Sequence, residues 1–199
     1  MKKMSKASTT LIVVALVVVV VAMSAFSMYN GLVTKDEGVS TAWADLQSQY
    51  QRRSDLIPNL VSTVKGYAKL ESETLEGVVS ARARATQVTV DADNLTPEKL
   101  QQIQAAQGEL SAALGKLLAI SENYPQLKAN ENFSELQAQL EGTENRINES
   151  RRLYNEAVQN YNVSVRRFPN NLLSGMFGFE KKAKFEAEAG ADKAPKVEF

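Results

Sequence analysis

The sequence contains no histidine and no cysteine among its 199 residues. Their absence removes the commonest general base, the thiolate nucleophile and most ligation of zinc, copper, haem and iron–sulfur clusters. A disulfide framework is excluded as well, so the composition does not indicate a reducing or an oxidising compartment. The chemistry left to this chain is that of carboxylates, hydroxyls and amines.

The chain also lacks an excess of charge of either sign, with 23 basic and 23 acidic residues. Lys2, Lys3 and Lys6 precede the first apolar segment, which leaves 20 basic against 23 acidic residues from Tyr29 onward. A domain that binds nucleic acid normally carries clustered Lys and Arg on one face. We therefore expect no nucleic-acid partner, and the length leaves room for one membrane segment and one domain.

A long uncharged segment extends over residues 7–34, and residues 11–21 are almost entirely Val, Leu, Ile and Ala. Residues 9–28 as a helix would rise about 30 Å, which matches the hydrocarbon thickness of a bilayer. We predict a short basic tail at residues 1–8 and a transmembrane helix over residues 9–28. The alternative is a cleaved secretory signal with small residues as its processing site, but the uncharged segment is longer than a usual signal core.

Three lysines precede this segment, whereas the flank that follows it offers only Lys35, next to Asp36 and Glu37. Positively charged flanks stay in the cytoplasm. We therefore expect a cytoplasmic N-terminus and a domain outside the cytoplasm.

Apolar residues recur at alternating steps of three and four from Leu32 onward, which indicates helices. Pro58 interrupts this pattern, and a proline inside a helix removes a backbone hydrogen bond at a cost of about 3 kcal/mol. One long kinked helix fits, as do two helices that meet between Arg53 and Pro58. We favour two helices, with Asp55 as the cap of the second, because an unbroken helix over residues 29–85 would be roughly 85 Å long.

Two further helices have clear start signals. Thr96 is expected to cap one of them, with Pro97 at its first position. Asn132 and Glu135 resemble a capping box at the start of the next, which Pro169 ends. We therefore predict an all-α protein with an N-terminal transmembrane helix, an antiparallel four-helix bundle over residues 29–169 and an irregular C-terminal tail over residues 170–199.

The densest motif is the segment Gln-Arg-Arg-Ser-Asp-Leu-Ile-Pro-Asn-Leu-Val at residues 51–61. Arg53 falls at a core-facing position, and an inward arginine needs a carboxylate partner. The candidate partners are Asp55, Glu71, Glu144 and Glu156. We interpret Arg53 as a member of a buried ion pair that fixes the helix register, and a binding surface is the alternative.

A Tyr-Asn pair at residues 154–155 recurs one heptad later at residues 161–162. A tyrosine on a buried helix face needs a partner for its hydroxyl, so we expect polar layers inside the bundle. Histidine is lacking for a di-metal bundle, and the acidic turn at residues 91–94 is too short for an EF-hand. We expect no cofactor, no metal and no enzymatic activity.

Specific motifs occur along almost the whole chain: Tyr29-Asn30-x-Leu32-Val33, Trp43-Ala44-Asp45-Leu46, residues 51–61, Val64-Lys65-Gly66-Tyr67, Glu144-Asn145-Arg146-Ile147, Arg151-Arg152-x-Tyr154-Asn155, Tyr161-Asn162, Phe168-Pro169 and Phe177-Gly178-Phe179. Together they resemble the bacterial LemA family. The resemblance implies a membrane-anchored helical bundle in a family without an established enzymatic activity. Some members resemble lipoproteins with a cysteine before the Tyr-Asn pair, and Met28 at that place favours a proteinaceous anchor here.

The expected function is that of a non-enzymatic scaffold or adaptor in the bacterial inner membrane that binds another protein of the cell envelope. An accessory or chaperone-like subunit of a membrane protease or phosphatase is the alternative, and homo-oligomerisation fits both. The tail from Asn170 onward is expected either to dock onto the partner or to cap the bundle, because no helical period organises Phe177, Phe179, Phe185 and Phe199. The candidate interaction or structural residues are Trp43, Arg52, Arg53, Asp55, Pro58, Asn59, Tyr154, Tyr161, Phe177 and Phe179.

Overall fold

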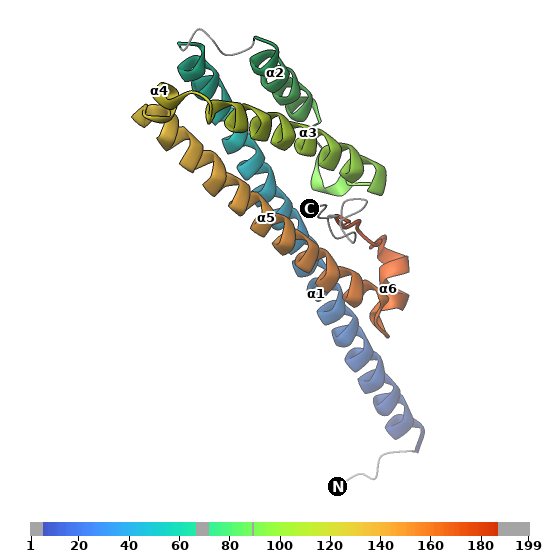
Figure 1. The fold of residues 1–199 in the computed structure, drawn as a ribbon. Helices are drawn as coiled ribbons and strands as arrows, with labels where there is room; N and C mark the ends of the chain where they lie inside the picture. The colour runs from blue at the N-terminus through green and yellow to red at the C-terminus, as the bar shows by residue number, and fades with distance from the viewer. Residues whose placement is uncertain (1–5, 67–71, 89, 187–199) are drawn as a thin grey trace, which may run out of the picture.

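The computed structural model describes residues 6–66, 72–88 and 90–186, and within these ranges the regular elements are all helices (Figure 1). The predicted all-α class is therefore confirmed at this level. The elements are α1 (Lys6–Lys65), α2 (Ser72–Gln87), the short 3-10 helix η1 (Ala92–Asn94), α3 (Pro97–Ser121), α4 (Pro125–Lys128), α5 (Glu131–Arg166) and α6 (Asn170–Phe177).

Helix α1 is continuous over 60 residues, about 90 Å, and it includes Pro58. The expected break between Arg53 and Pro58 is wrong. Asp55 caps no helix, and it accepts a hydrogen bond of 2.7 Å from Gln51 one turn earlier in α1. The helix ends at Lys65, before Gly66, and glycine is a poor helix former.

Helix α5 runs antiparallel to α1 along the domain (Figure 1). The direction follows from three contacts, in which rising positions of α1 meet falling positions of α5. The contacts are Lys35 with Ser164, Trp43 with Tyr154, and Arg53 with Glu144. Helices α2 and α3 form a second packed pair that covers the C-terminal part of α1 (Figure 1).

The core has two apolar clusters along α1. The first surrounds Trp43 and joins α1 to α5, to α3 and to the segment after α6. The second surrounds Leu60 and joins α1 to α2, α3 and α5. All the long helices therefore contribute to burying one face of the C-terminal half of α1.

The start of α3 agrees with its sequence signals, because Thr96 Oγ1 accepts a hydrogen bond of 3.3 Å from the amide of Lys99 and Pro97 is the first helical residue. The start of α5 corrects its predicted cap. Asn130 is the N-cap, and its side-chain oxygen accepts a hydrogen bond of 3.1 Å from the amide of Phe133. Asn132 lies inside the helix.

Among the described helices, α1 alone is long and apolar enough to cross a membrane by length and composition. Residues 7–24 are all exposed, and the first partly buried residues along α1 are Ala25 and Met28. The tail that was expected to be irregular begins with α6, and residues 179–186 then run without helix along the domain.

Candidate functional site

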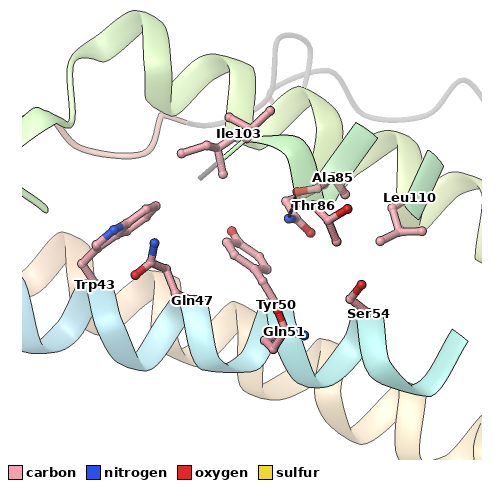
Figure 2. A pocket seen from close by; sticks show the side chains of 11 residues that line it. Trp43, Gln47, Tyr50, Gln51, Ser54, Ala85, Thr86, Ile103 and Leu110 are labelled. Atoms are coloured by element: carbon pink, nitrogen blue, oxygen red, sulfur yellow. Dashed lines mark hydrogen bonds between the residues drawn. The ribbon is translucent and has the colours of Figure 1, made fainter. Parts of the chain in front are cut away.

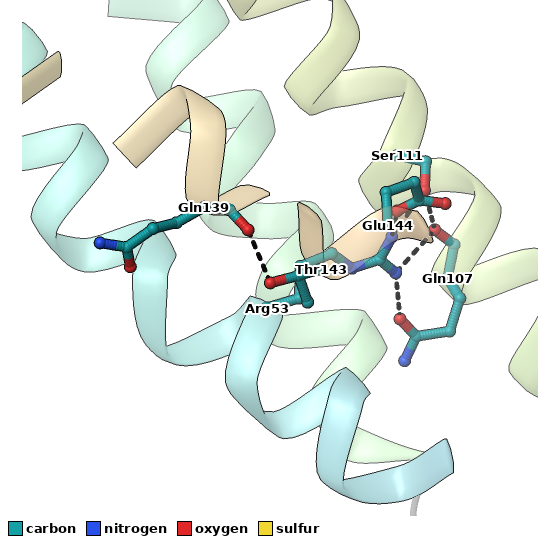
Figure 3. A network of polar contacts seen from close by, with 6 residues as sticks. All are labelled: Arg53, Gln107, Ser111, Gln139, Thr143 and Glu144. Carbon is teal, nitrogen blue, oxygen red and sulfur yellow. Dashed lines mark hydrogen bonds and ion pairs between the residues drawn. The ribbon is translucent and has the colours of Figure 1, made fainter. Parts of the chain in front are cut away.

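Arg53 lies at the centre of a polar network that joins three helices (Figure 3). Its side chain is 2% exposed. One terminal nitrogen donates to Ser111 Oγ at 2.8 Å and to the carboxylate of Glu144, and the other donates to the side chain of Gln107. The network therefore ties α1 to α3 and α5 in one register, as expected of a buried arginine that is paired and hydrogen-bonded.

Glu144 is one of the four carboxylates that the sequence offered as a partner of Arg53. Of the others, Asp55 is exposed, Glu156 pairs at the surface with Arg152, and Glu71 lies outside the described residues. The amide of Gln107 was not anticipated, because a polar residue within the α3 stripe gives no sign of its partner.

A cavity of about 120 Å³ lies between α1, α2 and α3, one turn from Arg53 (Figure 2). Tyr50 and Ser54 point into it from α1, and within the described part of the chain the Ser54 hydroxyl has no hydrogen-bond partner. Trp43 at one end donates its indole N–H to the carbonyl of Val90 at 2.9 Å. Burial raises the pKa of the Tyr50 phenol, so this group is a neutral hydrogen-bonding group near neutral pH.

The repeated Tyr-Asn pairs on α5 hold the chain's own tail. Asn155 exchanges two hydrogen bonds, of 2.9 and 3.0 Å, with the backbone of Phe185. Asn162 exchanges two bonds of 2.9 Å with the backbone of Lys182, and the Tyr154 hydroxyl donates to the carbonyl of Ala183 at 3.0 Å.

We call the contacts of Tyr154, Asn155 and Asn162 with the backbone of residues 182–185 the tail clamp. Its spacing follows from chain geometry. Seven residues of α5 rise about 10.5 Å, and three residues of extended chain span about 10 Å, so residues 182 and 185 match asparagines one heptad apart. The tail therefore runs antiparallel to α5 in a fixed register.

The tail aromatics, for which the sequence left docking and capping open, differ in their burial. Phe185 is 6% exposed and packs between Trp43 and Tyr154, with ring centroids at 6.3 and 5.5 Å. Phe179 is partly buried against Tyr29, whereas Phe177 touches the same ring and stays 54% exposed. Phe199 lies outside the described residues. The segment that carries Phe179 and Phe185 is not helical, so its buried residues do not recur with a helical period that a sequence pattern could reveal.

Burial raises the pKa of the Tyr154 phenol to about 12. The pKa of Tyr161 is raised to about 12 as well, chiefly by burial and further by the carboxylates of Asp36 and Glu180. Lys182 lies 5.6 Å from the Tyr161 ring centre and pairs with Asp36 at 2.7 Å, which closes the clamp beside α1.

The other candidate residues of the 51–61 motif face outward, whereas Ile57, Leu60 and Val61 are buried. Arg52, Asp55, Pro58 and Asn59 are all exposed. Arg52, Asp55 and Asn59 follow at steps of three and four, so they share one side of α1. This side of the motif takes no part in the core.

Arg52 and Arg146 line a groove of about 300 Å³ between α1 and α5, in which Glu135 is the one acidic residue. Ala138 and Gly142 keep the groove open, and a Cβ added to Gly142 would meet nothing within 4 Å. In the described part of the chain neither arginine forms an ion pair. Sequence reasoning missed Arg146 as a site residue, although its place two residues after the inward Glu144 directs it to the outer face.

Within the described ranges no three acidic side chains gather to hold a metal ion. The structure thus defines an all-helical protein with a candidate N-terminal membrane span, a polar network inside the domain and an arginine-lined groove outside it. The LemA family model matches residues 42–199, and the chain belongs to the LemA family.

Curated relatives extend over most of the chain. Magnetosome protein MamQ 2 of Paramagnetospirillum magneticum is 26% identical over 185 residues, which cover 82% of this chain and 66% of that protein. Magnetosome protein MamQ of Magnetospirillum gryphiswaldense is 25% identical with the same coverage. Protein LemA of Metamycoplasma hominis is 24% identical over 159 residues, or 79% of this chain and 68% of that protein. The chain thus spans about two thirds of the length of these relatives.

Proposed function

We propose that the protein is a non-enzymatic scaffold or adaptor anchored in the bacterial inner membrane by a single span, with its domain on the extracytoplasmic side. Helices α1, α2, α3 and α5 form the four-helix bundle of this domain. Its partner is another protein of the cell envelope, which presents an acidic segment to the groove lined by Arg52 and Arg146.

The observation that carries this proposal is the continuity of α1. A domain on a flexible linker samples many positions, whereas a helix without interruption holds its domain at a constant height and angle. Arg53 and the tail clamp fasten α3, α5 and the segment after α6 onto this helix. A body mounted in this way suits a protein that positions a partner beside the membrane.

The groove supplies the proposed contact with the partner. Two guanidinium groups without ion pairs attract carboxylates and bind them with paired hydrogen bonds. The small side chains of Ala138 and Gly142 leave room for an incoming segment.

Photo-crosslinking in intact cells tests this contact. A photoreactive phenylalanine at Ala138, in the groove, is expected to capture a partner, and the same group at the exposed Leu153 on α5 serves as the control. The variant Arg52→Glu/Arg146→Glu keeps the fold, because both side chains are exposed, and abolishes the adduct. Equal capture from both positions, or capture that survives charge reversal, contradicts the proposal.

The identity of the captured protein separates the scaffold from the alternative roles. A membrane protease or phosphatase would indicate an accessory subunit, and a second copy of the chain would indicate a homo-oligomer. The side of the membrane is tested by Asp45→Cys, since Asp45 is exposed and the chain has no other cysteine. An impermeant maleimide should label it in cells with a permeabilised outer membrane, and protection from labelling would reverse the orientation.

A further inference from the structure

Exposed apolar side chains of the domain fall into two groups. Val79, Leu153 and Val163 are single exposed residues, which are ordinary on a soluble surface. The others gather on α6 and beside it. They are Tyr29 at 37% exposed, Phe168 at 76%, Leu172 at 60%, Met176 at 77% and Phe177 at 54%.

Two members of this cluster share one face of α6. Leu172 and Met176 are four residues apart in the helix, the spacing that brings residues onto one side, and Phe168 lies in the turn directly before it. The other side of α6 is attached to the domain, because Ser174 is buried and its hydroxyl donates to the carbonyl of Val165 at 3.1 Å. The apolar face of α6 is therefore exposed, because its opposite side is attached to the domain.

The position of α6 along α1 indicates what covers this face. The Phe177 ring lies edge-on to Tyr29, with centroids 5.1 Å apart, and Tyr29 directly follows the candidate span. Helix α6 accordingly lies beside the end of the apolar segment of α1 (Figure 1). With residues 9–28 in the hydrocarbon, this level is the boundary of headgroups and acyl chains, where aromatic side chains concentrate.

The charges around the face complement a lipid surface. Arg166 and Arg167 precede the apolar residues, Lys181 follows them next to the acidic Glu180, and all three basic residues are exposed. Within the described residues none of the three forms an ion pair. An apolar helix face flanked by basic residues is the composition of helices that lie in the membrane interface.

We infer that α6 is an interfacial membrane-binding helix that inserts Leu172 and Met176, together with Phe168 from the turn before it, into the bilayer surface beside the span. The domain then has two attachments to the lipid, the span itself and α6. This inference rests on the proposed insertion of residues 9–28, and it assigns the outer face of α6 to the membrane and not to a protein partner.

The test uses the full chain in vesicles of phosphatidylcholine and phosphatidylglycerol, with one nitroxide label at a time. The absence of native cysteine allows single labels at Leu172→Cys and at Leu153→Cys, an exposed leucine farther along α5. The label at Leu172 should collide with oxygen, which concentrates in lipid, far more often than with a water-soluble nickel complex. The label at Leu153 should show the opposite preference.

A third label at Val17→Cys, within the span, tests the insertion of residues 9–28 separately from lipid binding by α6. Oxygen preference at Val17 together with nickel preference at Leu172 overturns the inference about α6 and leaves the anchor intact. Nickel preference at Val17 overturns the anchor itself, and the inference with it. Protection of Leu172 from both reagents indicates that protein covers the face, which also overturns lipid binding.

Discussion

Arg82 of α2 donates its Nε hydrogen to the backbone carbonyl of Ser54 at 2.8 Å. That carbonyl is the one that residue 58 would bond in a regular helix, and Pro58 has no N–H to donate. The side chain of Arg82 thus replaces the missing helix bond from another element. This contact explains how α1 passes through Pro58 without a break.

Removal of this contact is expected to destabilise the domain only when Pro58 is present. Arg82→Met should lower the free energy of unfolding by about 1–3 kcal/mol, because Ser54 is buried and its carbonyl loses a charged donor. In a Pro58→Ala background the helix supplies its own bond, and the loss should shrink to less than about 1 kcal/mol. Denaturant unfolding of the full chain in detergent, followed by the single buried Trp43, measures both values.

The control is Arg84→Met, which breaks a surface pair with Glu109 in which both side chains are 55% exposed. Such pairs contribute about 0–1 kcal/mol. An equal effect of Arg82→Met with and without Pro58 would show that Arg82 does not compensate for the proline.

The expected break at Pro58 shows the limit of the sequence. The cost of an interior proline is a local property, but its compensation comes from a residue 24 positions later, which no local pattern reveals. The true end of α1 had a local signal in Gly66. The α3 start was predictable because Thr96 and Pro97 act on the helix that directly follows them.

Arg53 and Glu144 are expected to differ in their effects, because Arg53 is buried and the Glu144 side chain is 41% exposed. Glu144→Ala leaves a buried cation without its anion and should cost about 3–5 kcal/mol. Arg53→Met leaves a carboxylate that water can solvate, and the cost should be about 1–3 kcal/mol.

The double variant Arg53→Met/Glu144→Ala should be no less stable than Glu144→Ala alone. Glu156→Ala, which removes a surface partner of Arg152, is the control and should cost less than about 1 kcal/mol. A loss from Arg53→Met that equals or exceeds that from Glu144→Ala would contradict this asymmetry.

The burial of Phe185 favours capping by the tail over docking onto a partner. Phe185→Ala should lower stability by about 3–5 kcal/mol, as for other buried aromatic residues. Phe177→Ala, at a ring that is 54% exposed, should change it by less than about 1 kcal/mol. The midpoints of thermal unfolding compare the two, and equal midpoints would mean that the tail does not belong to the core.

The candidate site was predictable only where its residues lie on regular helices. Periodicity predicted that Arg53 faces the core, but it left four candidate carboxylates, of which Glu144 is the partner. The partner of Asn155 and Asn162 is an extended backbone, which carries no period. The sequence displays the repeated Tyr-Asn pair, but the tail that it holds appears only in the fold.

Stability should decrease as the pH rises from about 10 to about 12. The pKa of Tyr154 and that of Tyr161 are raised to about 12 in the fold, against about 10 in the unfolded chain. The unfolded state therefore loses these protons first, so the contribution is complete below pH 10 and is lost as the pH passes 12. Unfolding midpoints between pH 8 and 11.5 should fall, and Tyr154→Phe/Tyr161→Phe should flatten the decline. An unchanged slope in this variant would assign the decline to other groups.

The rigid mounting of the domain is tested most directly by one distance in the full chain in lipid nanodiscs. Spin labels at Ser27→Cys and Ser62→Cys, both exposed on α1, are separated by 35 residues. An unbroken helix predicts a single narrow distribution of distances centred at about 52 Å. A broad distribution, or a second population at much shorter distances, would show that α1 bends between the span and the domain and would contradict a scaffold that holds its partner at a constant position.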